Sequence, residues 1–401
     1  LVEGVMGLFD GRGPSSEGSS AAVAAQLGLP VVFVVEASRQ AGSLAALVRG
    51  FRDHGPPAVQ LAGVVLNRVG SERHHALLAE ALASIEVPLL GVLPHHPSLE
   101  LPSRHLGLLP PGELHDLEQR QEQWAELAAR HLDLDQLVPL LAPPAAEPGA
   151  ENPISWCLGQ SPQRLRQSSQ PLPVAIASDA AFHFRYPEAG ELLEAVGLEP
   201  LAWSPLADEP LPAGCRAVLL PGGYPELHTA QLAASRRSLG DLARAAAAGL
   251  PLVAECGGLL LLGEQLADGE GQLQPMAGVL PFQARKGALS LGYRTATATA
   301  NGLLVRPGES FCGHEFHRWQ LEPVAAGGGL WQLDGWGTAT RSEGWTAPNV
   351  HASWLHLHWA GCPVIPSRLA AAAARAAPLP TSAASCSPTN PGPRSSKSAG
   401  V

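Results

Sequence analysis

Short runs of apolar residues recur along most of the chain, separated by stretches with helical or turn character. Two nearly continuous runs, at positions 31–36 and 61–67, are typical of parallel strands that are buried on both faces. A second alternation of strands and helices begins at residue 174 and continues to about residue 360. This pattern predicts an α/β protein with two domains, the first built around a parallel sheet.

Composition divides the chain at two places. Residues 143–172 are rich in Pro, Ser, Gln and Gly and are predicted to form a linker between domains at 1–142 and 173–362. Residues 363–401 consist largely of Ala, Pro and Ser, and we expect a disordered tail there. Within that tail, a helical turn or two is expected over 368–377.

Length, charge and cysteine content narrow the class of protein. A chain of 401 residues is long enough for two hydrophobic cores, and no apolar run is long enough to span a membrane. The net charge of −10 argues against general nucleic-acid binding. Six scattered cysteines without a CxxC pair argue against a zinc site and a disulfide framework, and predict a cytoplasmic protein. The sequence leaves open whether the chain forms a homo-oligomer.

The most informative local pattern is the pentapeptide AECGG at 254–258. It follows the apolar run 250–254 and precedes four leucines, which predicts a strand, a sharp turn and a helix. Cys256 would then lie at a helix N-terminus, where backbone N–H groups favour the thiolate. A buried structural cysteine is the commoner alternative for an isolated cysteine, but the turn favours a nucleophile.

A nucleophilic thiol requires a base, and the segment 350–359 supplies histidines. Its residues alternate as in a strand, with Trp354, His356 and His358 on one face. An imidazole held there can take the thiol proton and return it to a leaving group. His356 is the preferred candidate, and His358 and His351 are its rivals.

A glycine turn completes the candidate site. The apolar run at 217–220 leads into Pro-Gly-Gly, so Gly222 and Gly223 can present backbone N–H groups to a developing oxyanion. Together with Gly257 beside the thiol, they are the predicted oxyanion and substrate-binding residues. Taken alone, an ordinary strand-ending turn would be the better interpretation.

These motifs together resemble the class I glutamine amidotransferase domain of the cobyrinic acid a,c-diamide synthase and cobyric acid synthase families. The matching stretches are DAAF at 179–182, LPGGYPE at 220–226, ECGG at 255–258, GHEFH at 313–317 and SWLHLH at 353–358. The resemblance implies that Cys256 forms a thioester with glutamine and that His356 is the catalytic histidine. Two positions depart from the usual glutaminase pattern: His358 stands where a glutamate is usual, and Trp354 where a tyrosine is common.

Polar residues in the first domain are candidates for a second site. Glu3, Asp10 and Asn67 lie where strands of a parallel sheet end, and ligands bind at such edges. Carboxylates there can hold Mg²⁺ against phosphates, and an asparagine can pair with an adenine edge. Solvated loop positions are the simpler interpretation of Glu3 and Asp10.

The stretches EGVMGLFDG at 3–11, GVVLNRV at 63–69 and LPSRHLGL at 101–108 resemble the ATP-dependent half of the same synthase family. That half is similar to dethiobiotin synthetase and other P-loop proteins. The resemblance implies ATP and Mg²⁺, with Glu3 as a metal ligand, Asp10 near the metal or a substrate carboxylate, and Asn67 at the nucleotide base. The implied substrates are cobyrinic acid, glutamine and ATP.

One motif of that family does not occur here. No G-x-x-x-x-G-K-[ST] phosphate loop is found in the sequence, which predicts a fragment that retains glutaminase chemistry but not ATP-driven amidation. A divergent, loop-free protein is the alternative. The rival functions are amidation of hydrogenobyrinate or nickel sirohydrochlorin, cobyric acid synthesis, and a degenerate partner that only binds a ligand.

Overall fold

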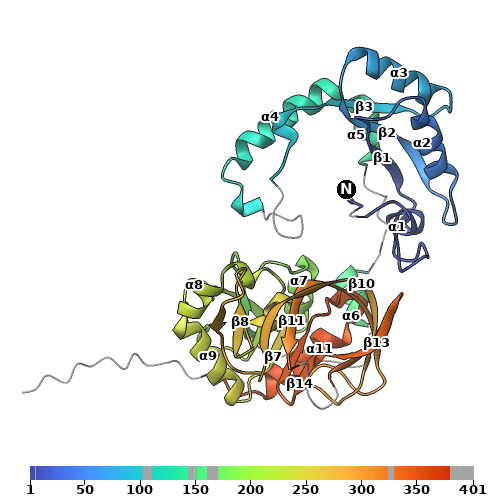
Figure 1. Ribbon diagram of the computed structural model, residues 1–401. Coiled ribbons are helices and arrows are strands. Elements are labelled where there is room, and N and C mark those ends of the chain that lie inside the picture. Colours follow the sequence, from blue (N-terminus) through green and yellow to red (C-terminus); the bar gives the residue numbers. More distant parts are fainter. Residues whose placement is uncertain are drawn as a thin grey trace, which may run out of the picture. The chain divides into compact units, whose positions relative to one another are not determined.

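The computed structural model describes residues 1–4, 6–102, 111–142, 149, 151–159, 170–323 and 329–379. The chain divides into two compact units, Leu1–Ala150 and Glu151–Val401. Both units combine strands with helices (Figure 1).

The first unit contains a parallel three-stranded sheet in the order β1-β2-β3. Leu44 and Val48 of one helix, with Leu78 and Leu82 of the next, are fully buried and form much of its core. The strands are β1 (Pro30–Glu36), β2 (Gln60–Val69) and β3 (Leu89–Pro94), and the helices are α1 (Ser20–Leu27), α2 (Ser43–Asp53), α3 (Glu72–Ala83), α4 (Leu117–His131) and α5 (Leu134–Leu140), with short 3₁₀ turns at η1 (Pro97–Leu99) and η3 (Pro111–Glu113).

The prediction of two fully buried strands holds for β2 only. Val64 and Leu66 of β2 are fully buried, because β2 lies between two other strands. β1 forms an edge of the described sheet, and its Val34 is 60% exposed. Continuous apolar sequence therefore predicts both strands here, but not the burial of the outer one.

The second unit is built on a six-stranded sheet in the order β14-β15-β7-β6-β4-β5. All neighbours pair in parallel except the edge strand β14, which is antiparallel to β15. The strands are β4 (Leu172–Ala177), β5 (Leu198–Trp203), β6 (Ala217–Leu220), β7 (Leu252–Glu255), β14 (Trp345–Ala347) and β15 (Val350–Ser353), and the helices are α6 (Pro153–Gly159), α7 (Pro187–Ala195), α8 (Thr229–Ala234), α9 (Arg236–Ala247), α10 (Gly257–Leu260) and α11 (Val364–Arg375), with 3₁₀ turns at η4 (Pro225–Leu227) and η5 (Trp359–Gly361).

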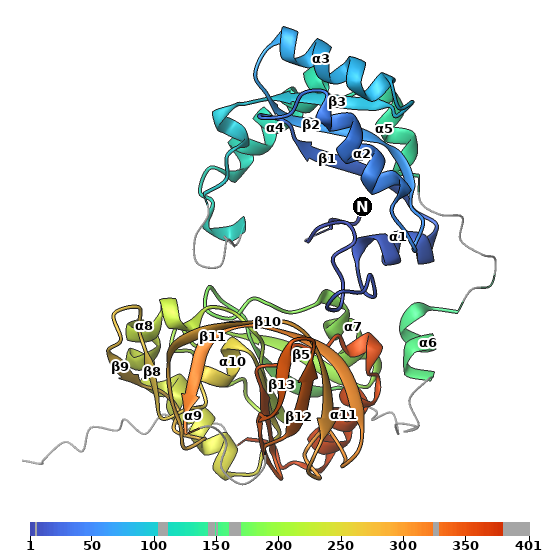
Figure 2. The same ribbon diagram turned by 45° about the vertical axis from the view of Figure 1, so that its right-hand side comes forward.

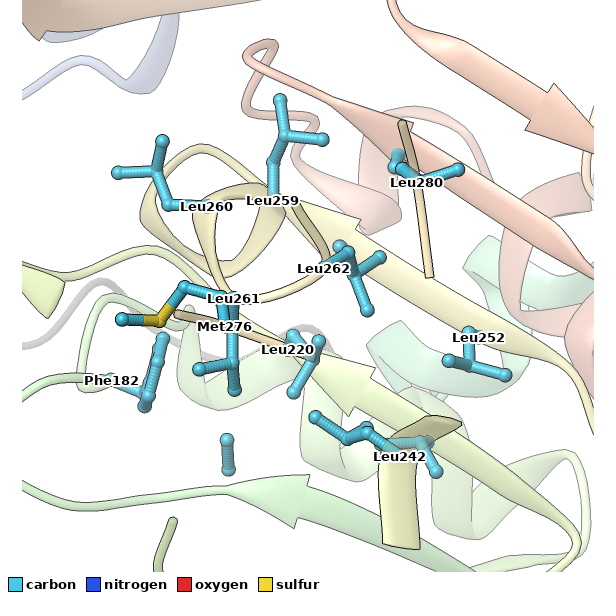
Figure 3. Packing of buried hydrophobic residues seen from close by; sticks show 14 of the residues in the cluster. Phe182, Leu220, Leu242, Leu252, Leu259, Leu260, Leu261, Leu262, Met276 and Leu280 are labelled. Atoms are coloured by element: carbon cyan, nitrogen blue, oxygen red, sulfur yellow. The ribbon is translucent and has the colours of Figure 1, made fainter. Parts of the chain in front are cut away.

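This sheet has a hydrophobic core on each face. Alternate residues of each strand face opposite sides, so Leu252 and Val253 of β7 belong to different clusters. The first cluster surrounds the predicted turn after β7, and Figure 3 shows the four leucines 259–262 packed among its members. Those leucines are buried, as their run after the pentapeptide predicts.

The strands of a second sheet come between β7 and β14 in the sequence, and this sheet supplies part of the site. Its strand order is β13-β12-β10-β8-β9, with β11 paired antiparallel to β10 along most of its length. The long β10–β11 ribbon is visible in Figure 2. Its strands are β8 (Gln265–Ala267), β9 (Leu273–Pro275), β10 (Gln283–Ala298), β11 (Ser310–Glu322), β12 (Trp331–Gly335) and β13 (Thr338–Glu343).

Two predicted boundaries need correction. Within the predicted linker 143–172, residues Pro153–Gly159 form α6, and its Cys157 is buried in the second unit's core. Within the predicted tail 363–401, Val364–Arg375 form α11, whose Ile365 and Leu369 are also buried there. The helical turns expected over 368–377 are part of α11, which begins earlier, whereas α6 was not expected. Ala-rich and Pro-rich sequence still packs when apolar side chains recur on one face. Residues 380–401 lie outside the described residues.

Candidate active site

Cys256 lies on a strained turn between a strand and a one-turn helix. β7 ends at Glu255 and α10 begins at Gly257, so the cysteine is the single residue between them. Its φ of 46° and ψ of −116° fall in a region that residues with a Cβ rarely adopt. Its backbone N–H donates to the Ser353 carbonyl oxygen at 2.8 Å and ties the turn to β15. The predicted strand, turn and helix are confirmed.

The Cys256 thiol is 6% exposed, and its surroundings favour the protonated form. Burial raises the pKa of the Cys256 thiol far above its ordinary value, and the charge of Glu226 raises it further. A backbone hydrogen bond from Gly257 only partly opposes this. The helix N-terminus favours the thiolate through the Gly257 N–H, as predicted, but burial outweighs this contribution. A base must therefore take the thiol proton during attack.

The glycine turn packs directly against the cysteine turn. A Cβ added to Gly223 would lie 2.0 Å from the Ala181 carbonyl oxygen, and one added to Gly257 would lie 2.6 Å from the Gly223 carbonyl oxygen. Only glycine allows backbone segments to approach so closely. The sequence-predicted residues Gly222, Gly223 and Gly257 therefore lie together beside the thiol.

The side chains of His356 and Cys256 both lie next to Gly222. A Cβ added to Gly222 would lie 2.8 Å from His356 Cε1 and 3.6 Å from Cys256 Cβ. The imidazole and the thiol-bearing carbon thus flank the same glycine, although they are a hundred residues apart in sequence. This places the preferred histidine candidate at the candidate nucleophile.

The imidazole of His356 is neutral near pH 7. Burial, with a smaller contribution from the nearby His314 and His317, lowers the pKa of His356 to about 3, although the charge of Glu315 acts to raise it. A neutral imidazole has a nitrogen lone pair that can accept a proton. The pair at rest is therefore a neutral thiol beside a neutral base.

The rival histidines point elsewhere. The ring of His358 is exposed and packs on Tyr186, with 4.6 Å between ring centroids. His351 is buried within β15, where its ring meets Trp331 edge-on at 5.7 Å. Among the three candidate histidines, His356 is the one placed beside Gly222.

The strand that carries these histidines is shorter than its sequence predicts. β15 ends at Ser353, and His356 forms only an isolated backbone bridge with His314 of β11. The pairing of β15 with β7 stops where Ser353 faces Glu255, the last residue of β7. Beyond that point, the Glu343 carboxylate at the end of β13 accepts the backbone N–H of Trp354 at 2.9 Å. The predicted burial of alternate residues still holds, because Leu355 and Leu357 are buried in one core cluster.

Glu343 and His314 are site-supporting residues to which the sequence assigned no role. Glu343 also accepts from the Ser353 hydroxyl at 2.6 Å, and burial raises the pKa of Glu343 to about 7. His314 exchanges backbone hydrogen bonds with His356, at 2.9 and 3.2 Å. The GHEFH motif contains His314 and was the signal available for it. No local signal pointed to Glu343, because its partners are ten residues away on another strand.

In the first unit, the three predicted residues have separate surroundings. Glu3 is exposed in the N-terminal coil, and the carboxylate of exposed Asp10 accepts the Gly7 backbone N–H at 3.0 Å. Asn67 lies near the carboxyl end of β2, opposite Glu36 of β1, and its side-chain oxygen accepts the Arg68 N–H at 2.9 Å. No hydrogen bond or ion pair joins any two of these three residues within the described part of the chain.

Among the described residues, no group of three or more His, Cys, Asp or Glu side chains is arranged to hold a metal ion. Mg²⁺ bound with a nucleotide commonly uses only one or two carboxylates, with phosphate oxygens and water as its other ligands. The exposed carboxylate of Glu3 fits that donor chemistry. Of the helices in the described ranges, none is both long and apolar enough for a transmembrane span.

Comparison with known proteins adds to this geometry. Residues 173–363 match the model of the CobB/CobQ-like glutamine amidotransferase domain, and residues 10–109 match that of the CobQ/CobB/MinD/ParA nucleotide binding domain. These two matches agree with the predicted fold class: a nucleotide-binding α/β domain followed by a glutamine amidotransferase-like domain.

Relatives match nearly the whole chain. The cobyrinate a,c-diamide synthase of Gloeobacter violaceus is 45% identical over 90% of this chain and 76% of its own length. The hydrogenobyrinate a,c-diamide synthase of Streptomyces coelicolor is 40% identical over 92% of this chain and 79% of its own length. Among solved structures, PurLQS from Thermotoga maritima covers 51% of this chain and 98% of that chain, at 16% identity and a TM-score of 0.39. On the two sequence relationships, the chain belongs to the cobyrinate and hydrogenobyrinate a,c-diamide synthase family.

Proposed function

We propose that this protein takes part in glutamine- and ATP-dependent amidation of the a and c carboxylates of cobyrinic acid, with Cys256 as the nucleophile that releases ammonia from glutamine. The observation that carries the proposal is the meeting of Cys256 and His356 over Gly222. The matched amidotransferase and nucleotide-binding models support the two halves of the reaction.

In the proposed glutaminase step, Cys256 Sγ attacks the side-chain carboxamide carbon of glutamine. The S–H bond breaks as the S–C bond forms, and the proton passes to the neutral ring of His356. Backbone N–H groups around Gly222, Gly223 and Gly257 stabilise the oxyanion. His356 then returns the proton to the amide nitrogen as the C–N bond breaks, which releases ammonia and leaves a thioester. Water hydrolyses the thioester to glutamate and regenerates the thiol.

The protonation states at rest support this order of events. Because the thiol pKa is raised and the His356 pKa is lowered, no ion pair accumulates before substrate binds. Proton transfer is then coupled to carbon–sulfur bond formation, which limits reaction of a free thiolate with other electrophiles.

In the first unit, we propose nucleotide binding at the carboxyl end of the β1–β3 sheet, with Asn67 at the base and Asp10 and Glu3 toward phosphate, metal or substrate carboxylate. The matched nucleotide-binding model over residues 10–109 supports nucleotide binding in this unit, and the position of Asn67 near the carboxyl end of the central parallel strand β2 supports its proposed role. When bound, Mg²⁺ supplies charge neutralisation for the nucleotide phosphates. Activation by phosphorylation makes the carboxylate of the macrocycle reactive toward ammonia.

The macrocycle that is amidated is cobyrinate or hydrogenobyrinate, because relatives named for each of the two match this chain at similar identity. Incubation with each macrocycle, ATP, Mg²⁺ and ammonium chloride, followed by mass spectrometry, discriminates between them. Any such amidation by these 401 residues would also refute the expectation drawn from the missing phosphate loop.

The central test is glutamate release from glutamine, which needs no macrocycle. We expect release by the unaltered chain and none by Cys256→Ala, with an unchanged circular dichroism spectrum. Glutamate release by Cys256→Ala would reject Cys256 as the nucleophile.

A further inference from the structure

The imidazoles of His314 and His356 are stacked face to face. Their ring centroids are 4.9 Å apart and their planes differ by 11°. The two residues also form a backbone bridge, in which the His356 N–H donates to the His314 carbonyl oxygen at 2.9 Å and the His314 N–H donates back at 3.2 Å. The ring of His356 is therefore fixed to β11 through both its backbone and one ring face.

Two glycines lie so close to His356 that a larger residue at either position would clash with it. A Cβ added to Gly313 would lie 2.5 Å from the His356 carbonyl oxygen, so the bridge requires glycine at that position. Gly222 approaches His356 Cε1, and its absent side chain leaves room for the ring. His356 is thus confined between His314 and the glycine turn.

The usual source of orientation for a catalytic histidine is a carboxylate that accepts its second N–H. Here the position two residues after His356 is His358, whose ring packs on Tyr186. The charged and titratable groups that act on His356 are His314, His317 and Glu315, all from β11. Glu315 is already held by Arg294 at 2.7 Å and Arg341 at 2.6 Å.

We propose that His314 is a positioning residue for the glutaminase step, holding the His356 imidazole by its face where related active sites use a carboxylate. The inference rests on the proposed role of His356 as the base. Burial lowers the pKa of His314, so the ring stacked on His356 is neutral near pH 7.

The test compares three substitutions at this position. His314→Ala and His314→Leu remove the flat ring and are expected to lower kcat for glutamate release about 10- to 100-fold with little change in KM, because a misplaced base slows proton transfer rather than glutamine binding. His314→Phe keeps a flat face and is expected to stay within about 3-fold of the unaltered protein. His358→Ala is the matched control, since His358 is exposed and away from the thiol, and should leave kcat unchanged.

Proton NMR gives a readout that a general loss of structure does not imitate. Stacking predicts an upfield ring-current shift of the His356 ring protons in the unaltered protein, retained in His314→Phe and lost in His314→Leu. Equal kcat in the Leu and Phe variants, or no shift difference between them, would overturn the positioning role.

Labelling with 6-diazo-5-oxo-L-norleucine, a glutamine analogue that alkylates nucleophilic thiols, separates the two proposals. If the unaltered chain is not labelled at Cys256, the proposed glutaminase function fails, whatever His314 does. If Cys256 is labelled equally fast in the unaltered protein and in His314→Leu, the function stands and the positioning role fails. We expect labelling in both, slower in the variant.

Discussion

Glu343 and Ser353, ten residues apart in the chain, meet in a buried hydrogen bond of 2.6 Å between a carboxylate and a hydroxyl. The same hydroxyl accepts the Trp331 indole N–H at 3.1 Å and the Leu355 backbone N–H at 3.0 Å. One carboxylate thus organises the segment that runs from the end of β15 to His356. The position of His356, the candidate base, therefore depends on β13, a strand that contributes no reacting atom.

Removal of this carboxylate should destabilise the second unit. Glu343→Ala leaves the Ser353 hydroxyl and the Trp354 N–H without their buried acceptor, at an expected cost of about 3 kcal/mol in unfolding free energy. Glu343→Gln keeps one acceptor oxygen and should cost about 1 kcal/mol. Urea unfolding followed by tryptophan fluorescence measures both. Glu270→Ala, at an exposed position, should change stability by less than about 0.5 kcal/mol.

Gly222→Ala should abolish most glutaminase activity without unfolding the protein. Its new methyl group would occupy the space 2.8 Å from His356 Cε1 and displace the ring from the thiol, with an expected loss in kcat of about 100-fold. Gly190→Ala is the matched control, because no atom lies within 4 Å of a Cβ built there on α7. Full activity in Gly222→Ala would contradict the arrangement of thiol and imidazole described above.

Replacing the Glu315 carboxylate by a neutral group should lower the free energy of unfolding. Burial acts to raise its pKa, but the nearby His317, with 3.7 Å between its Nε2 and the carboxylate, and the charges of Arg341 and Arg294 outweigh it and lower the pKa of Glu315 to about 2. Glu315→Gln leaves two arginines without their carboxylate, and we expect a loss of about 3–5 kcal/mol near neutral pH.

The control for Glu315 is another Glu–Arg pair on the same ribbon. Glu322 and Arg285 are 3.7 Å apart and both exposed, so Glu322→Gln should cost less than about 1 kcal/mol. Thermal unfolding of the two variants in parallel measures the difference. Similar losses in both would show that burial does not set the value of the Glu315 contacts.

Because of His351, the free energy of unfolding should decrease as the pH falls. Burial lowers the pKa of His351 from 6.5 to about 4, so between these values the unfolded chain binds a proton that the folded chain does not, and stability declines with decreasing pH. His351→Gln removes this titration. Relative to its effect at about pH 7.5, the substitution should gain about 2 kcal/mol at about pH 5. Denaturant titrations of both proteins at the two pH values give the difference, and a pH-independent effect would disprove it.

The sequence predicts the cysteine turn well because its signals are local. An apolar run, a small-residue pentapeptide and a leucine run fix the strand, turn and helix without help from distant residues. The glycine turn after β6 is equally local. What the sequence could not supply is the distance between these turns, which follows from the order of β6, β7 and β15 in the sheet.

The incorrect predictions have physical causes of the same kind. The strand that carries His356 ends early because, among the described residues, its neighbours β7 and β14 provide no pairing partner beyond Ser353, and the ends of these neighbours cannot be read from the histidine segment itself. The thiol is protonated at rest because of burial, which a linear motif does not reveal. In the first unit, Glu3 lies in coil and the Asp10 carboxylate accepts the Gly7 backbone N–H, and the roles of both residues toward metal, phosphate or substrate stay predictions.

The backbone of Cys256 has a consequence for engineering and for divergence of this family. With a φ of 46°, this position is one that glycine adopts without strain and other residues adopt at a cost of about 1–3 kcal/mol. Replacement by glycine would relieve that strain while removing the thiol. Variants selected only for thermal stability should therefore drift toward glycine here, so a stable relative with Gly at this position would be a marker of lost chemistry rather than of a damaged fold.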